Sequence, residues 1–443
     1  MKLCAVSLLA TLLGCDPVQP PPAPVVRTEV LQLKANPNPD LDLLFVIDDS
    51  PSMADKQAAL AAAFPKFLDE LGNLRGGIPN LHIGVISSDM GTKGSAVPEP
   101  GPPVGGGQGG CVGAGKSGVL QKGAAVLEGE YLYAVAHRDG ATNFTGTLAD
   151  TFRLMATLGA AGCGFEQHLH ALRTSFTHPF NRGFLRESAN LAVIILADED
   201  DCSILDPGLY ELGEERFGPL GSFRCFEQGV ECSPDAPREL GVKDACRPRA
   251  GSAFVEDIAP FRDALLAQKG GDARKILLSA IVGAPGPVGV ESRVINNIPQ
   301  VALGHSCDIT PAGSRIVADP AIRIASLLQT FPGTSSLASV CSADLAPAVT
   351  QIGKALHRLA GDGCLTRTLA NPAVPDCIVE DVRDATPTIG VRMERCSEVG
   401  EDVTCYELVP DATCETALRL SVARAVPVDD ETWTRVSCVV PQS

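Results

Sequence analysis

Two short polar loops contain the residues of this chain that are best suited to bind a metal ion. In the first loop, Asp48, Ser50 and Ser52 place a carboxylate and two hydroxyls at alternate positions. The second loop, residues 198–201, is an acidic run that begins with Asp198. Hard divalent cations take oxygen ligands of these types. We therefore predict that these four residues bind Mg²⁺, or Mn²⁺ or Ca²⁺ in its place.

Each of the two loops directly follows an apolar run that has the length of a buried strand. Residues 41–47 are almost entirely apolar, and residues 191–197 are apolar throughout. Parallel strands end at one edge of a sheet, where ligands of open parallel sheets usually bind. We expect the strand register to direct Asp198 toward the loop of Asp48. A second cation, such as Ca²⁺, has candidate ligands in Glu199, Asp200 and Asp201.

Strands and helices alternate along residues 41–362 in the order of a doubly wound α/β fold. A helical pattern of apolar residues follows Ser52 and continues to Leu71. The other predicted strands are 81–87 and 276–282, and the other predicted helices are 147–158, 165–176, 254–268, 321–330 and 344–360. Right-handed crossovers between these strands predict a mostly parallel sheet.

The Asp-x-Ser-x-Ser spacing at the end of a buried strand resembles the metal-ion-dependent adhesion site of von Willebrand factor type A domains. The resemblance implies a Rossmann-like domain in which a later loop contributes Asp198. It also implies an open metal position that accepts an Asp or Glu of a partner protein. The family has a threonine ligand where this chain has Gly164, which carries no side chain. Glu166 is the predicted substitute, and water is the alternative.

A second interpretation is an envelope scaffold whose site binds no metal, which Gly164 and the altered later loop favour. An enzyme is not expected, because Ser50 and Ser52 have no identifiable histidine base. The sequence also contains neither a Gly-x-Ser-x-Gly nor a His-Glu-x-x-His motif. His168 and His170 lie two residues apart and so point to different faces of a helix. We expect them to be packing or surface residues.

Residues 110–117, GCVGAGKS, formally match the Walker A pattern for phosphate binding. A P-loop requires a preceding strand and a following helix, which together hold the phosphate. Glycines precede this segment and no helical apolar face follows it, so no nucleotide is predicted. The net charge of −17, without a basic cluster, also argues against nucleic acid as a partner.

The N-terminus, residues 1–14, resembles a lipoprotein signal peptide. Lys2 precedes an apolar run that ends in Leu-Leu-Gly immediately before Cys15. The resemblance implies that Cys15 is lipidated and anchors an exported protein to a membrane of the bacterial envelope. Residues 15–40 are predicted to be this anchor and a linker, which is proline-rich and extended over 17–24. No later segment is long and apolar enough to span a membrane.

The chain has 16 cysteines, and fourteen of them follow Cys15 without Cys-x-x-Cys pairs. This distribution predicts up to seven disulfides and an oxidising compartment. One predicted pair, Cys111–Cys163, would tie a glycine-rich excursion over 91–130 to the turn before Glu166. Four cysteines predict two disulfides in an insert over 199–253 that flanks the binding face. Six more predict a small disulfide-stapled β module over 363–443.

Overall fold

The computed structural model describes residues 26–441 with short gaps. The gaps are 36–37, 39, 75–76, 107–108, 136–139, 296, 312–314, 362, 384–389, 400–402, 412–413, 415 and 430–431. The predicted signal peptide, the lipidation site at Cys15 and the proline-rich segment lie outside the described residues.

A six-stranded sheet forms the centre of the molecule, with the order β13-β8-β5-β2-β3-β4. Its strands are β2 (Asp40–Ile47), β3 (Asn80–Ser87), β4 (Leu132–Val135), β5 (Asn190–Leu196), β8 (Ile276–Val282) and β13 (Ser335–Ser339). Neighbouring strands are parallel except at one edge, where β4 runs antiparallel to β3. The four predicted strands are confirmed to within one residue, whereas the two short edge strands were not predicted.

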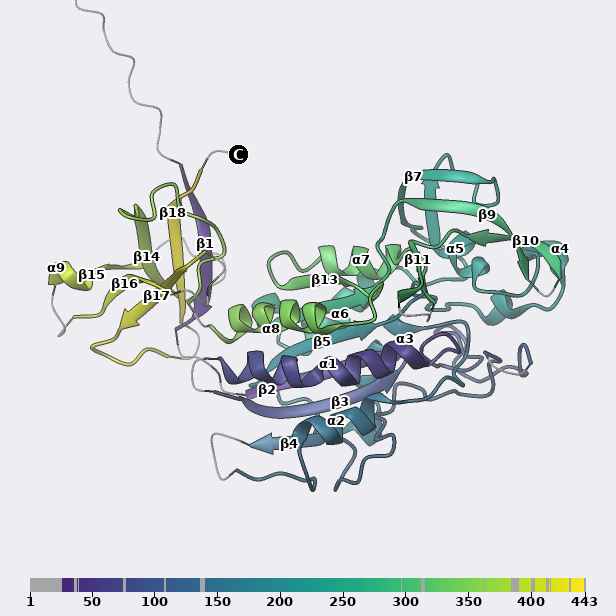
Figure 1. Ribbon diagram of the computed structural model, residues 1–443, viewed down its shortest axis with the longest axis horizontal. Coiled ribbons are helices and arrows are strands. Elements are labelled where there is room, and N and C mark those ends of the chain that lie inside the picture. The colour runs from purple at the N-terminus through teal and green to yellow at the C-terminus, as the bar shows by residue number, and fades with distance from the viewer. Residues whose placement is uncertain are drawn as a thin grey trace, which may run out of the picture.

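Helices cover both faces of this sheet (Figure 1). One face packs against α1 (Ala54–Gly72), α2 (Leu148–Ala156) and α8 (Ala346–Ala360), and the other against α3 (His168–Ser175), α6 (Ala259–Ala267) and α7 (Ile322–Gln329). Successive side chains of a strand point to opposite faces. Accordingly, Phe45 packs in the first core and Leu44 and Val46 in the second. The domain is of mixed α/β class, as predicted, and its central strands β2, β5 and β8 are mostly apolar because both faces of the sheet are buried.

The predicted insert does not stand alone, because a second excursion after β8 pairs with it. Strands β6 (Val230–Ser233) and β7 (Gly241–Pro248) belong to the insert, and β9 (Val288–Ile295) and β10 (Ile298–Leu303) belong to the second excursion. Together they form an antiparallel sheet with the order β10-β9-β7-β6. Apolar side chains from both excursions share one small core. The two predicted disulfides are present as Cys202–Cys225 and Cys232–Cys246.

Short elements complete the two excursions and the connections. The insert also contains η2 (Pro207–Tyr210), α4 (Glu214–Phe217) and α5 (Phe223–Gly229). After β10, a small hairpin is formed by β11 (Cys307–Ile309) and β12 (Ile316–Ala318). Two single-turn helices are η1 (Pro179–Asn181) and η3 (Ala273–Lys275).

The C-terminal module lies at the end of the molecule opposite the insert (Figure 1). Its sheet has the order β1-β18-β14-β15-β16-β17. The strands are β1 (Arg27–Lys34), β14 (Cys377–Val382), β15 (Val391–Arg395), β16 (Cys405–Pro410), β17 (Leu418–Ala423) and β18 (Trp433–Val439), and a short helix, α9 (Cys396–Val399), follows β15. The prediction that residues 15–40 are an anchor and a linker is wrong for β1, because this strand pairs antiparallel with β18. Burial of Val30, Leu31 and Leu33 in the module core explains this pairing.

All fourteen cysteines after Cys15 form disulfides. The other pairs are Cys111–Cys163, Cys307–Cys341, Cys364–Cys414, Cys377–Cys438 and Cys396–Cys405. The predicted Cys111–Cys163 pair is thus confirmed. Seven disulfides indicate an exported or extracellular protein. Among the described residues, no helix has both the length and the hydropathy to cross a membrane.

Candidate metal centre

The two predicted loops meet because they leave adjacent parallel strands at the same edge. Ile47 of β2 pairs with Leu196 of β5. The amide of Asp48 continues this ladder by donating to the carbonyl of Leu196 at 3.0 Å. Asp198 leaves the same edge two residues after Leu196, as the parallel register predicted.

A continuous chain of polar contacts joins the four predicted oxygen ligands. Asp48 Oδ1 accepts a hydrogen bond from the amide of Ser50 at 2.8 Å. The hydroxyls of Ser50 and Ser52 are 3.2 Å apart, and Ser52 Oγ donates to Asp198 Oδ1 at 3.1 Å. Asp48, Ser50 and Asp198 are buried, whereas Ser52 is exposed. The site therefore opens to solvent on the side of Ser52.

Glu166 lies beside these polar contacts, in the turn that precedes α3. A Cβ atom added to Gly164 would lie 3.8 Å from Glu166 Oε1, so this carboxyl approaches the position where the resemblance implies a threonine. Glu166 is 2% exposed. Burial raises its pKa, and the nearby carboxylates of Glu199 and Asp48 raise it further. Four of the five predicted residues are thus joined by contacts, and Glu166 lies near enough to Asp48 for the two carboxyls to interact electrostatically.

Asp49, next to Asp48, belongs to a different contact. Its Oδ1 accepts a hydrogen bond from Ser87 Oγ at 2.6 Å, and its Oδ2 pairs with the ammonium of Lys116. Lys116 is the lysine of the GCVGAGKS segment, so its side chain is used within the protein. The positive φ of Gly115 (+57°) places that residue against the backbone of Gly91. This geometry supports a structural role for the segment.

The last two residues of the acidic run stabilise helix ends. Asp200 accepts hydrogen bonds from the first amides of α7, with 2.8 Å to the amide of Arg323. Asp201 accepts a hydrogen bond from the amide of Leu169 in α3 at 2.9 Å and pairs with the buried guanidinium of Arg323 at 3.1 Å. Carboxylates at helix N-termini are favoured by the unpaired amides and the helix dipole. Asp200 and Asp201, which were predicted with Glu199 to serve a second cation, thus use their carboxylates in contacts within the protein.

Two buried basic residues that were not predicted to belong to the site, Lys56 and His168, lie against it. The ammonium of Lys56 is 3.0 Å from Asp198 Oδ2, an ion pair without hydrogen-bond geometry, and donates to the carbonyl of Ser52 at 2.9 Å. Nε2 of His168 is 3.8 Å from Asp48 Oδ2. Lys56 is 4% exposed and His168 is fully buried. The sequence contained an indication that Lys56 is buried, because it precedes Leu60 and Phe64 at helical spacing on the buried face of α1.

These neighbours set the protonation of the site. Burial and the charge of Asp48 raise the pKa of Asp198 to about 6, although Lys56 opposes the shift. Burial alone would lower the pKa of His168, but Asp48 raises it above its ordinary value. The site thus combines two carboxylates with two groups that can carry positive charge.

The oxygen donors fit a hard divalent cation. Asp48 Oδ2 is buried without a hydrogen-bond partner, so it has a free lone pair beside the serine hydroxyls. Within the described part of the chain, no set of three or more His, Cys, Asp or Glu side chains is arranged to hold a metal. A cation here would therefore depend on the mixed donor set of Asp48, Ser50, Ser52 and Asp198.

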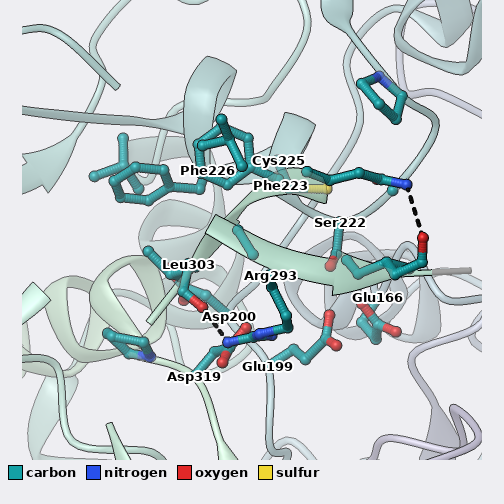
Figure 2. Close-up of a pocket in the computed structure, with 18 of the residues that line it drawn as sticks. Glu166, Glu199, Asp200, Ser222, Phe223, Cys225, Phe226, Arg293, Leu303 and Asp319 are labelled. Atoms are coloured by element: carbon teal, nitrogen blue, oxygen red, sulfur yellow. Dashed lines mark hydrogen bonds between the residues drawn. The ribbon is translucent and has the colours of Figure 1, made fainter. Parts of the chain in front are cut away.

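A cavity of about 320 Å³ adjoins the acidic side of the centre. We call it the insert cavity, because the insert and the second excursion form most of its wall. Figure 2 shows Glu166 and Glu199 on one side of it and Phe223 and Phe226 on the other, with Arg293 between them. The predicted insert therefore flanks the face that carries the candidate ligands.

Comparisons with known proteins give no family for this chain. No protein-family model matches it, and no curated protein does. Among solved structures, the pilus adhesin SpaC from Lactobacillus rhamnosus GG in its open conformation is 11% identical, with a TM-score of 0.32, and the alignment covers 92% of this chain and 39% of SpaC. The human COPII-coat protein Sec24c is 9% identical, with a TM-score of 0.30 and coverage of 92% and 40%. The pilus adhesin RrgA from Streptococcus pneumoniae is 10% identical, with a TM-score of 0.28 and coverage of 94% and 58%.

Proposed function

We propose that the central domain is of the von Willebrand factor type A kind and binds a partner protein through a divalent cation. The observation that carries this proposal is the convergence of Asp48, Ser50, Ser52 and Asp198 through contacts of 2.8 to 3.2 Å. The strand order supports the fold assignment, because the chain fills one side of β2 with β3 and β4 and then the other side with β5, β8 and β13. That order is typical of doubly wound sheets.

In this proposal, Asp48 and the two serines hold the cation, and Asp198 and Glu166 complete its surroundings directly or through water. Mg²⁺ is the first choice, since carboxylate, hydroxyl and water oxygens suit it, and Mn²⁺ and Ca²⁺ are alternatives. A bound cation supplies an electropositive centre to which an Asp or Glu of the partner can coordinate. The exposed side of Ser52 is the route by which such a carboxylate arrives. The role is recognition without catalysis.

The test is calorimetric titration of Mg²⁺ and Mn²⁺ into the purified chain, followed by capture of partners from an envelope extract with and without chelator. We expect saturable binding of at least one cation, loss of that binding in Asp48→Ala, and release of the partner by chelator. Asp55→Ala is the matched control, because Asp55 is an exposed aspartate on the first turn of α1. Absence of binding by both cations would overturn the proposal.

The second candidate function is a metal-free scaffold, and the buried cations favour it. Lys56 and a protonated His168 balance the charges of Asp198 and Asp48 without a metal. Such a site would hold the β2 and β5 loops together by buried ion pairs. It predicts partner capture that is unaffected by chelator, which distinguishes it from the first candidate.

Anchoring at Cys15 is the remaining part of the proposal. A lipidated Cys15 would tether the exported chain to an envelope membrane, and residues 17–24 would separate the domain from the lipid surface. The test is metabolic labelling with a fatty acid: label should enter the wild-type chain and not Cys15→Ser. Equal labelling of both chains would contradict lipidation at this residue.

A further inference from the structure

The insert cavity has two walls of opposite character. Glu166 and Glu199 lie on the wall beside the candidate metal centre. The facing wall is formed by apolar side chains of the two excursions: Phe223, Phe226, Val301 and Leu303. At about 320 Å³, the cavity has the size of a small organic ligand site. Figure 2 shows the two walls facing each other across Arg293.

Most charged groups of the cavity wall already have partners. Asp200 caps α7 and Asp201 pairs with Arg323. Three further charged residues pair within 2.8 Å: Asp319 with His305, Arg238 with Glu227, and Arg293 with Glu291. Among the described residues, no basic side chain pairs with the carboxyl of Glu166 or Glu199. These two glutamates are therefore the uncompensated groups of the cavity.

The two glutamates lie close enough to perturb each other. Glu166 is nearly fully buried, and its carboxyl interacts with that of Glu199. Both carboxyls line the cavity opposite its apolar wall, and neither has a basic partner among the described residues. A buried carboxylate without a counter-charge is stabilised by a cation that reaches it. The wall therefore suits a positively charged ligand.

The facing wall indicates what kind of cation fits. Phe223 and Phe226 have ring centroids 5.6 Å apart and, with Val301 and Leu303, provide apolar surface without oxygen ligands for a hydrated metal ion. Such a surface packs against alkyl or aryl groups, and aromatic faces attract ammonium groups. The two walls together suit a molecule with an ammonium at one end and an apolar body at the other.

We infer that the insert cavity is a binding site for a small organic amine with an apolar body. Its ammonium lies against Glu166 and Glu199, and its body packs on Phe223 and Phe226. The proposed metal-dependent recognition opens on the side of Ser52, whereas the amine occupies the insert cavity, and Glu166 is the one residue that both sites use. Amine binding therefore does not require a cation at Asp48.

Arg293 is the competing cation within the chain. Its guanidinium donates to the carbonyl of Leu303 at 2.8 Å and, in Figure 2, lies on the side of Glu199, Asp200 and Asp319. An arriving ammonium must share this space and is repelled by the guanidinium. Removing that charge is expected to strengthen amine binding, which an adventitious apolar pocket would not show.

The test is calorimetric titration of phenethylamine into the purified, disulfide-intact chain in EDTA. Phenethyl alcohol has the same body without charge, and hydrocinnamate carries the opposite charge. We expect saturable binding of phenethylamine, at least about tenfold weaker binding of the alcohol, and no binding of hydrocinnamate. Equal affinity for the amine and the alcohol, or no binding of the amine, would overturn the inference.

Substitutions of cavity residues test where phenethylamine binds. Glu199→Gln is expected to weaken phenethylamine binding by about tenfold, since it removes one charged acceptor and keeps the shape. Glu407→Gln, on an exposed position of the distant β16, is the matched control and should leave binding unchanged. Arg293→Gln should tighten binding severalfold. Unchanged affinity in both Glu199→Gln and Arg293→Gln would place the amine elsewhere and refute the site.

Two further measurements separate this inference from the proposed function. Asp48→Ala should retain phenethylamine binding, and loss of amine binding in this variant would contradict a separate site. Titration of Ca²⁺ alone tests for an inorganic occupant. Heat of Ca²⁺ binding that disappears in Glu199→Gln, together with no amine binding in the wild type, would assign the glutamates to a metal instead.

Discussion

Replacement of Lys56 by methionine tests whether the candidate centre is built around a cation. The Lys56 ammonium lies 3.0 Å from Asp198 Oδ2, and both side chains are at most 4% exposed. At an effective dielectric constant near 20, the attraction at this distance is about 5 kcal/mol. Removal of one partner of a buried pair usually costs about 3–5 kcal/mol, because the other charge stays buried. Methionine keeps the apolar stem and removes the charge.

The assay is urea unfolding followed by circular dichroism, with disulfides intact, in EDTA and in saturating Mg²⁺ or Mn²⁺. In EDTA we expect Lys56→Met to lower the free energy of unfolding by about 3–5 kcal/mol. A cation at 100 times its Kd should restore about 2.7 kcal/mol. Lys66→Met is the control, because its pair with Asp69 is 65% exposed on both sides and contributes below about 1 kcal/mol.

Two results would refute this reasoning. Unchanged stability of Lys56→Met in EDTA would show that the ion pair contributes nothing to the fold. A loss of stability that neither Mg²⁺ nor Mn²⁺ restores would show that a divalent cation cannot take the place of the ammonium. The second result would favour the metal-free scaffold.

Three further predictions concern the residues around the site. Burial lowers the pKa of His170 to about 4, so the folded state resists protonation of this residue. The free energy of unfolding should therefore fall by up to about 3 kcal/mol from pH 6.5 to pH 4. Urea unfolding at each pH should show that His170→Gln removes this dependence of stability on pH. Gly115→Ala should cost more than about 2 kcal/mol in thermal unfolding, because its Cβ meets backbone at a positive φ, whereas Gly129→Ala, which meets nothing within 4 Å, should cost about 1 kcal/mol. Arg323→Met should destabilise the chain by about 3–5 kcal/mol through the unpaired Asp201, and a loss below 1 kcal/mol on urea unfolding would contradict this.

The main strands of the central domain could be predicted, because a strand that is buried on both faces consists mostly of apolar residues. Strands β2, β3, β5 and β8 were found from runs of mostly apolar residues, in which single polar residues such as Asp42 and Ser279 occur. The edge strand β13 has the sequence SSLAS, and only alternate residues of it are buried, so no such run exists there. Strand β1 was missed for a different reason: its partner β18 lies at the other end of the chain. Pairing over that distance leaves no signal in the strand itself.

The same division applies to the candidate site. The types and spacing of Asp48, Ser50, Ser52 and Asp198 determined which oxygens are available, and the parallel sheet brought them together, since both loops leave one edge. Whether these oxygens face a metal or a protein cation was decided by tertiary structure. Lys56 reaches the site from α1 on one face of the sheet and His168 from α3 on the other.

By itself, the sequence determined the α/β class, the apolar strands, the oxygen donors at their ends and the number of cysteines available for disulfides. Tertiary structure alone decided that two excursions distant in the chain share one sheet and that Asp200 and Asp201 cap helices. It also decided that Glu166 and Glu199 have no basic partner among the described residues. The physical reason is the distance along the chain between the residues that determine each property. Burial of a strand depends on its own residues, whereas the pairing of charges depends on which elements pack side by side.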